Sequence, residues 1–193
     1  MNNEEFEIKF LEVDVPSLEK KLLEIGATKT GEHNYIRRTF DYPDFRLDDK
    51  HKWLRVRTDG KETTLTYKER LGVKSNDTSI PDEGMKEIEV TVNDFEKTCE
   101  IIKSTGFILK HEAKNNRIRY VKNDVVFDID FWPQIPPYIE IESTTLQKAR
   151  DAAFELGFDG DSGIICSVNQ VYKKYGINLK EYTTITFEGM VKK

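Results

Sequence analysis

The stretch Glu5-Phe6-Glu7-Ile8-Lys9 decides the fold. If it forms a β-strand, successive side chains point to opposite faces, so its charged residues share one face and its apolar residues the other. One such strand is ordinary, because a half-buried strand shows the same pattern. However, the alternation recurs at residues 55–57, 87–90, 117–119, 128–130 and 140–142. The polar faces of these strands carry almost only full charges, whereas a merely solvated face would mix in Ser, Thr and Asn.

Composition sets the broad class of the protein. The chain has 193 residues, 37% of them hydrophobic and 34% charged, with a net charge of -5. This length fits one domain, or one domain with appended elements. The last predicted helix stops near Gly176, so the domain is expected over residues 1–176, and residues 177–193 form a C-terminal extension to which no structure is assigned. The acidic balance argues against nucleic-acid or anionic-membrane partners. Cys99 and Cys166 form neither a metal-binding spacing nor a disulfide framework. Without an apolar leader or spanning segment, a cytoplasmic location is expected.

Glycine residues mark the predicted turns and the predicted ends of helices. The residue pair Asp59-Gly60 predicts a tight hairpin between two strands. The polar segment 71–85 predicts a long, mobile loop. Asn93 is the predicted N-cap of one helix. Apolar residues at helical spacing lead to glycine stops at four places: Gly26, Gly106, Gly157 and Gly176.

Many strands and a few amphipathic helices predict an α+β protein with an antiparallel sheet or barrel. The helices need apolar surface to cover. The apolar strand faces supply it, through Phe6, Ile8, Val56, Ile88, Ile118, Ile129 and Ile141. The charged faces then turn toward one another and line an interior.

The charges of that interior suit two kinds of group. Arginine and lysine bind phosphate oxygens, and carboxylates bind Mg²⁺ or Mn²⁺. A polyphosphate with its metal would satisfy both. Arg–Glu ladders inside a two-layer sheet, with no ligand, would also explain the pattern, and both interpretations stay open at this point. The lining residues are Glu5, Glu7, Lys9, Arg55, Arg57, Lys68, Glu87, Glu89, Arg117, Arg119, Asp128, Asp130, Glu140 and Glu142.

In order and parity, these motifs resemble the CYTH family, the triphosphate tunnel metalloenzymes. The resemblance runs from Glu5 to about Gly176. It is carried by Glu5-x-Glu7-x-Lys9, Trp53-Leu54-Arg55-Val56-Arg57, Thr66-Tyr67-Lys68, Glu87-x-Glu89, Arg117-x-Arg119, Asp128-x-Asp130 and Glu140-x-Glu142. It implies an eight-stranded antiparallel β-barrel with a charged lumen and helices packed outside.

The resemblance also implies a role for each motif. Glu5 and Glu7 resemble carboxylates that orient the attacking water, and Glu87, Glu89 and Asp128 resemble supporting residues. Trp53 has the parity of the arginines that follow it, so it could stack an organic group or simply pack at a barrel end. The implied phosphate-binding residues are Lys9, Arg55, Arg57, Lys68, Arg117 and Arg119. The implied metal ligands, for Mg²⁺ or Mn²⁺, are Glu7, Asp130, Glu140 and Glu142.

The expected activity is metal-dependent hydrolysis of a small triphosphate: inorganic tripolyphosphate, thiamine triphosphate or a nucleoside triphosphate. The alternatives are a class IV-type adenylyl cyclase and a polyphosphate-binding module without turnover. The region before Glu5 lacks the His-Phe-like start of class IV cyclases, which favours hydrolysis. No histidine is given a catalytic role, and a homodimer remains open.

Overall fold

The computed structural model describes residues 4–71 and 84–193, with the main chain alone at Glu4, Glu5, Gly84 and Met85. The predicted mobility of segment 71–85 therefore falls almost wholly outside the described residues. The strands are β1 Glu4–Leu11, β2 Thr28–Asp41, β3 Lys52–Thr58, β4 Thr63–Leu71, β5 Gly84–Val92, β6 Ile108–Lys122, β7 Val125–Phe131, β8 Tyr138–Ser143, β9 Tyr182–Thr186 and β10 Gly189–Lys192. The α-helices are α1 Val15–Glu24, α2 Phe95–Ser104, α3 Leu146–Glu155 and α4 Val168–Lys174.

Capping side chains and glycine residues set the ends of the helices. All four predicted glycine stops have positive φ angles, between +74° and +94°, which glycine adopts without strain. At the start of α1 the Asp14 carboxylate accepts a hydrogen bond from the Ser17 amide at 3.2 Å. The prediction of Asn93 as N-cap of α2 is wrong by one residue. Asp94 is the cap, because its side chain reaches the Lys97 amide at 2.9 Å.

The strands form one sheet in the order β10-β9-β6-β2-β3-β4-β5-β1-β8-β7, and β6 also pairs with β7. Within the set β1 to β8, each strand pairs with two others of the set, and these pairings are all antiparallel. The predicted α+β class and antiparallel sheet are confirmed. The sheet has ten strands rather than eight, because the C-terminal segment adds β9, which runs parallel to β6, and β10.

Closure of the sheet is weakest between β1 and β5. These strands share only the pairs Glu4–Lys86 and Glu5–Met85. Farther along β1, Ile164 takes up the free edge, with two hydrogen bonds of 2.9 Å to the main chain of Lys9. The described sheet is thus an open, strongly curved wall along this seam and not a complete barrel.

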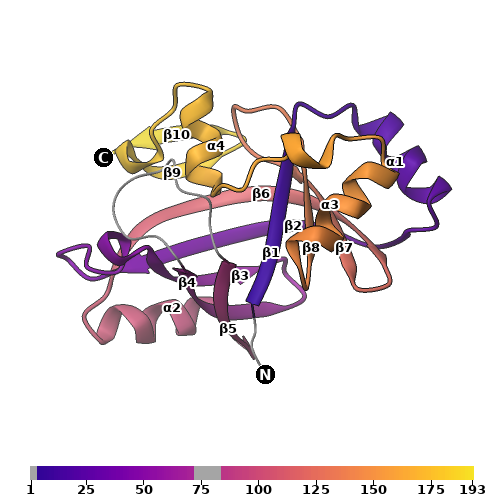
Figure 1. Ribbon diagram of the computed structural model, residues 1–193. Helices are drawn as coiled ribbons and strands as arrows, with labels where there is room; N and C mark the ends of the chain where they lie inside the picture. Colours follow the sequence, from indigo (N-terminus) through magenta and orange to yellow (C-terminus); the bar gives the residue numbers. More distant parts are fainter. Residues whose placement is uncertain (1–3, 72–83) are drawn as a thin grey trace.

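Three apolar clusters attach the helices to the sheet (Figure 1). In the first, α1 and α3 lie side by side and pack on β1, β7 and β8, with Leu22, Ile141 and Ala153 fully buried. In the second, α4 and β9 pack around Trp132 and Tyr138. In the third, α2 covers β2 and β3 through Ile102. The helices thus lie on the apolar side of the strands, as predicted.

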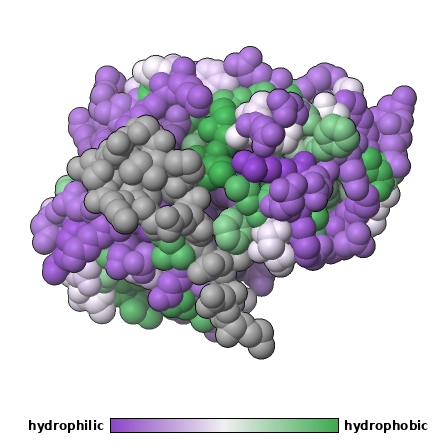
Figure 2. Space-filling model, viewed as in Figure 1, coloured by the Kyte–Doolittle hydropathy of each residue, from purple (hydrophilic) through white to green (hydrophobic). Residues whose placement is uncertain are grey.

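The apolar side is not covered everywhere. Ile8, Val56, Ile129 and Ile141 are at most 1% exposed, but Ile88 on β5 is 55% exposed. The expectation that helices cover Ile88 is therefore wrong, since the apolar cluster beneath α2 extends from β2 and β3 to Leu65 on β4 but includes no residue of β5 that the structure describes. The face seen in Figure 2 is mostly hydrophilic, with hydrophobic side chains gathered near its centre beside α4. Within the described residues, no helix has the length and apolar character needed to cross a membrane.

Candidate functional site

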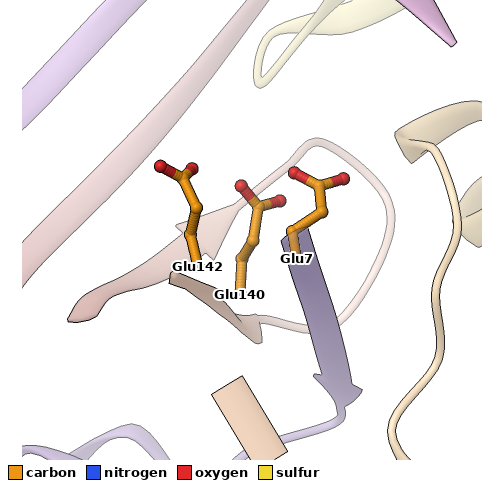
Figure 3. Close-up of side chains that lie close together, drawn as sticks. All are labelled: Glu7, Glu140 and Glu142. Atoms are coloured by element: carbon orange, nitrogen blue, oxygen red, sulfur yellow. The ribbon is translucent and has the colours of Figure 1, made fainter. Parts of the chain in front are cut away.

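Three carboxylates converge where β1 meets β8. The register sets Glu7 opposite Glu142 and Lys9 opposite Glu140, so all four side chains share the inner face. Figure 3 shows Glu7, Glu140 and Glu142 pointing the same way from two strands. A carboxylate oxygen from each lies within 4.8 Å of the others. Three oxygens at this spacing could hold a hard divalent cation.

Lys9 lies at the base of this acidic group. Its side chain is 1% exposed, and its Nζ lies 2.6 Å from Glu7 and 2.9 Å from Glu140. Burial opposes the charge of Lys9, but Glu140 and Glu7 outweigh burial and raise the pKa of Lys9. The ammonium therefore stays charged and neutralises part of the acidic group.

The two acids beside Lys9 titrate differently. Burial and then the charge of Glu140 raise the pKa of Glu7, although Lys9 acts against this. Burial also opposes ionisation of Glu140, but Lys9 and Arg117 overcome it and hold the pKa of Glu140 well below its usual range. Glu140 is thus the permanent anion, and Glu7 is the carboxylate that can take up a proton.

Asp130 is not in the acidic group. Arg117 holds it with contacts of 2.8 and 2.5 Å from Nε and Nη2, and Asn115 donates to it at 3.2 Å. Arg117 also bonds to Asp128, which in turn accepts two bonds from Arg119. Asp128 and Asp130 are each 1% exposed. In this structure Asp130 therefore orients a cation, as Asp128 does.

The other predicted cations line β3 and β4. Arg55 and Arg57 share one carboxylate, that of Glu89, which lies 3.7 Å from each. Lys68 pairs with Glu87 on the neighbouring strand β5. The two carboxylates predicted to be supporting residues thus hold basic residues in place.

Arg37 is an inward-facing cation that the sequence prediction did not name. Arg37 on β2 lies directly opposite Arg57 and is 8% exposed. A usable signal was present, because Ile36, Arg38 and Phe40 share the other parity. Ile36 and Phe40 place their parity, which includes Arg38, on the apolar face of the strand. Arg37 has the opposite parity and therefore lies on the charged face.

The remaining residues discussed in the sequence analysis belong neither to the acidic group nor to the arginines of β2 and β3. Trp53 follows the parity of Arg55 and lies opposite Lys68, where it is partly exposed. The main chain of Glu5 continues β1, but its side chain is outside the description. His33 bonds to Asp59 at 2.9 Å, away from the acidic group.

The chain belongs to the CYTH family. The CYTH domain model matches residues 3–164, which is most of the chain. Members of this family are generally metal-dependent triphosphatases or cyclases. Comparison with curated protein sequences gives no match.

Solved structures share the fold. The PH1012 protein of Pyrococcus horikoshii is 25% identical, with a TM-score of 0.69 over 84% of this chain and 96% of its own. A candidate adenylate cyclase from Vibrio parahaemolyticus is 11% identical, with a TM-score of 0.74 over 90% and 99%. The candidate adenylyl cyclase HpAC1 from Hippeastrum, described as having a dominant triphosphatase activity, is 14% identical, with a TM-score of 0.62 over 92% and 99%.

Proposed function

We propose that this protein is a divalent-metal-dependent hydrolase of a triphosphate bound between the charged inner faces of an eight-stranded tunnel, β1 to β8. The observation that carries the proposal is the division of the inner face. Glu7, Glu140 and Glu142 gather on β1 and β8. On the other part of the inner face, Arg55 and Arg57 of β3 both lie near the Glu89 carboxylate of β5. A chain of phosphates with its metal complements both halves.

The residues present fit Mg²⁺ or Mn²⁺. All three ligand groups are carboxylates, which these hard cations prefer, and none is a thiol or imidazole. Glu7, Glu140 and Glu142 would hold the ion, and their number leaves coordination positions for phosphate oxygens. The ion would supply charge neutralisation on the phosphoryl oxygens.

The chain's own residues then position the substrate and take up the proton of the attacking water. Arg55, Arg57, Lys68 and Arg117 bind phosphate oxygens and stabilise charge that develops as the bridging P–O bond breaks. The Glu7 carboxylate would orient the attacking water and accept its proton. The water oxygen bonds to phosphorus, and the leaving phosphate departs with the bridging oxygen. Glu5 would assist from the same strand.

Two other functions compete with hydrolysis. In an adenylyl cyclase the ribose hydroxyl, not water, would attack the α-phosphorus of ATP. In a binding module the triphosphate would remain intact. Hydrolysis requires fewer binding groups than cyclisation, because no further subsite is needed to place a ribose hydroxyl in line with the phosphorus.

A substrate panel separates these functions. Phosphate release from tripolyphosphate, thiamine triphosphate and ATP is measured beside cyclic AMP formation, in Mg²⁺, in Mn²⁺ and in EDTA. We expect phosphate release from at least one substrate, lost in EDTA. Cyclic AMP as the main product would establish a cyclase, and binding without any product would establish a module.

A further inference from the structure

Arg37 is a buried cation whose hydrogen-bond partner is uncharged. Its Nε donates to the Asn115 Oδ1 at 2.5 Å, and its guanidinium carbon lies 5.1 Å from the ring centres of Tyr35 and Trp132. In the part of the chain that the structure describes, Arg37 makes no ion pair, although the charge of Asp130 acts on it, and its Nη2 has no hydrogen-bond partner. This differs from Arg117, which is held by acids.

The neighbours of Arg37 add positive charge. Arg37 lies directly opposite Arg57, and Arg55 follows two residues along the same strand face. Like charges directly opposite one another in a sheet are destabilising. Within the described residues, Glu89 lies 3.7 Å from both Arg55 and Arg57, whereas Glu87 and Asp130 act on this group of arginines from farther away. Burial and the charge of Arg55 lower the pKa of Arg37. This excess of buried charge favours an anion as ligand.

Other buried donors near Arg37 also lack acceptors. The Nε of Arg55 and the Nε1 of Trp132 have no hydrogen-bond partner within the described residues. Guanidinium and indole N–H groups can only donate. Phosphate oxygens at neutral pH mainly accept hydrogen bonds. A phosphate group would therefore supply the acceptors that these buried N–H groups lack.

The position of Arg37 relative to the acidic group indicates which part of a bound ligand it would contact. Counted along strand pairings in either direction, β2 is four strands from β1. Arg37 therefore lies across the inner face from Glu7. We propose that Arg37 binds the phosphate chain directly, through oxygens that face away from the acidic group. This inference rests on the proposed function and deepens it, because it assigns a metal-independent phosphate contact to β2.

Arg37→Met tests the contact. Methionine keeps the length and apolar packing of the stem but removes the guanidinium. We expect tripolyphosphate to bind at least about tenfold more weakly by calorimetry in EDTA, as for a lost charge-assisted hydrogen bond. The KM in Mg²⁺ should rise by a similar factor, because the contact does not pass through the ion.

The adjacent arginine provides the matched control. Arg38 faces outward and pairs with Glu96 at 2.6 Å and Glu112 at 2.7 Å. Arg38→Met removes the same charge from the same strand and should leave tripolyphosphate affinity within about twofold.

The outcomes distinguish binding from structure. If Arg37→Met binds tripolyphosphate within twofold of wild type, the inference is overturned and the proposed function stands. A lowered Tm with unchanged affinity would make Arg37 a structural residue and also overturns it. If the wild type neither binds nor hydrolyses any of tripolyphosphate, thiamine triphosphate and ATP, both proposals fail. Should Arg37→Met not fold, Arg37→Gln replaces it: the amide can still hydrogen-bond to Asn115 but carries no positive charge, so affinity equal to that of wild type would refute the contact.

Discussion

Glu142 and Arg57 carry opposite charges on the same inner face, so at the residue scale they can separate metal binding from phosphate binding. Glu142→Gln keeps the shape of the side chain but weakens a ligand for a hard cation. We expect turnover to fall at least about 100-fold, as for a lost electrostatic catalytic group. Tripolyphosphate binding in EDTA should survive, because a carboxylate that repels phosphate has been removed. Steady-state rates and calorimetry measure the two effects.

Arg57→Ala is the converse variant. It should lose metal-free binding, because its guanidinium would contact phosphate whether or not an ion is present. If Glu142→Gln kept full activity, or lost metal-free binding as severely as Arg57→Ala, the assignment of acids to metal and arginines to phosphate would be wrong.

At the element scale, α2 shows how a helix supports the site without touching it. Its buried residues Cys99 and Ile102 pack against Phe40 and Val56, whose strands carry Arg37, Arg55 and Arg57 on the opposite face. The helix therefore stabilises the strands that position the arginines.

Two adjacent isoleucines of α2 test this. Ile102 is 6% exposed and Ile101 is 66% exposed. Ile102→Ala should lower the free energy of unfolding by about 2–4 kcal/mol, through lost burial and a cavity. Ile101→Ala makes the same change in helix propensity and should stay within about 0.5 kcal/mol. Urea unfolding gives both values. Equal losses would mean that α2 is not anchored through Ile102.

At the scale of the whole molecule, stability depends on protons taken up when the chain unfolds. Burial, and then Lys110 and Lys193, lower the pKa of His111 to about 4, against a usual value of 6.5. Between these values the unfolded chain holds a proton that the folded protein does not, so the free energy of unfolding falls as pH falls. Above pH 6.5 this contribution is fully present.

His111→Gln should remove this dependence. Relative to the variant, wild type is expected to lose about 1–2 kcal/mol between pH 7 and pH 5. Thermal or urea unfolding at several pH values gives the difference, and the shared carboxylates cancel in the comparison. A wild-type stability that falls no faster than that of the variant would show that His111 is charged in the folded protein.

The sequence by itself determined the features that depend on neighbours along the chain. The period-two alternation assigned Glu7, Lys9, Arg55 and Arg57 to one face, because successive strand residues point to opposite sides. The glycine stops and the Asp59-Gly60 turn were also predictable, since they depend on local backbone geometry.

Only the tertiary structure decided which charges meet. The partners of Asp130 and Glu142 depend on register between strands distant in sequence, and register follows from how the whole sheet packs. For the same reason Asp130 holds Arg117 instead of joining the acidic group, and Ile164 occupies the edge that β5 leaves beside Lys9. Local periodicity sets the face of a residue, but long-range packing sets its partner.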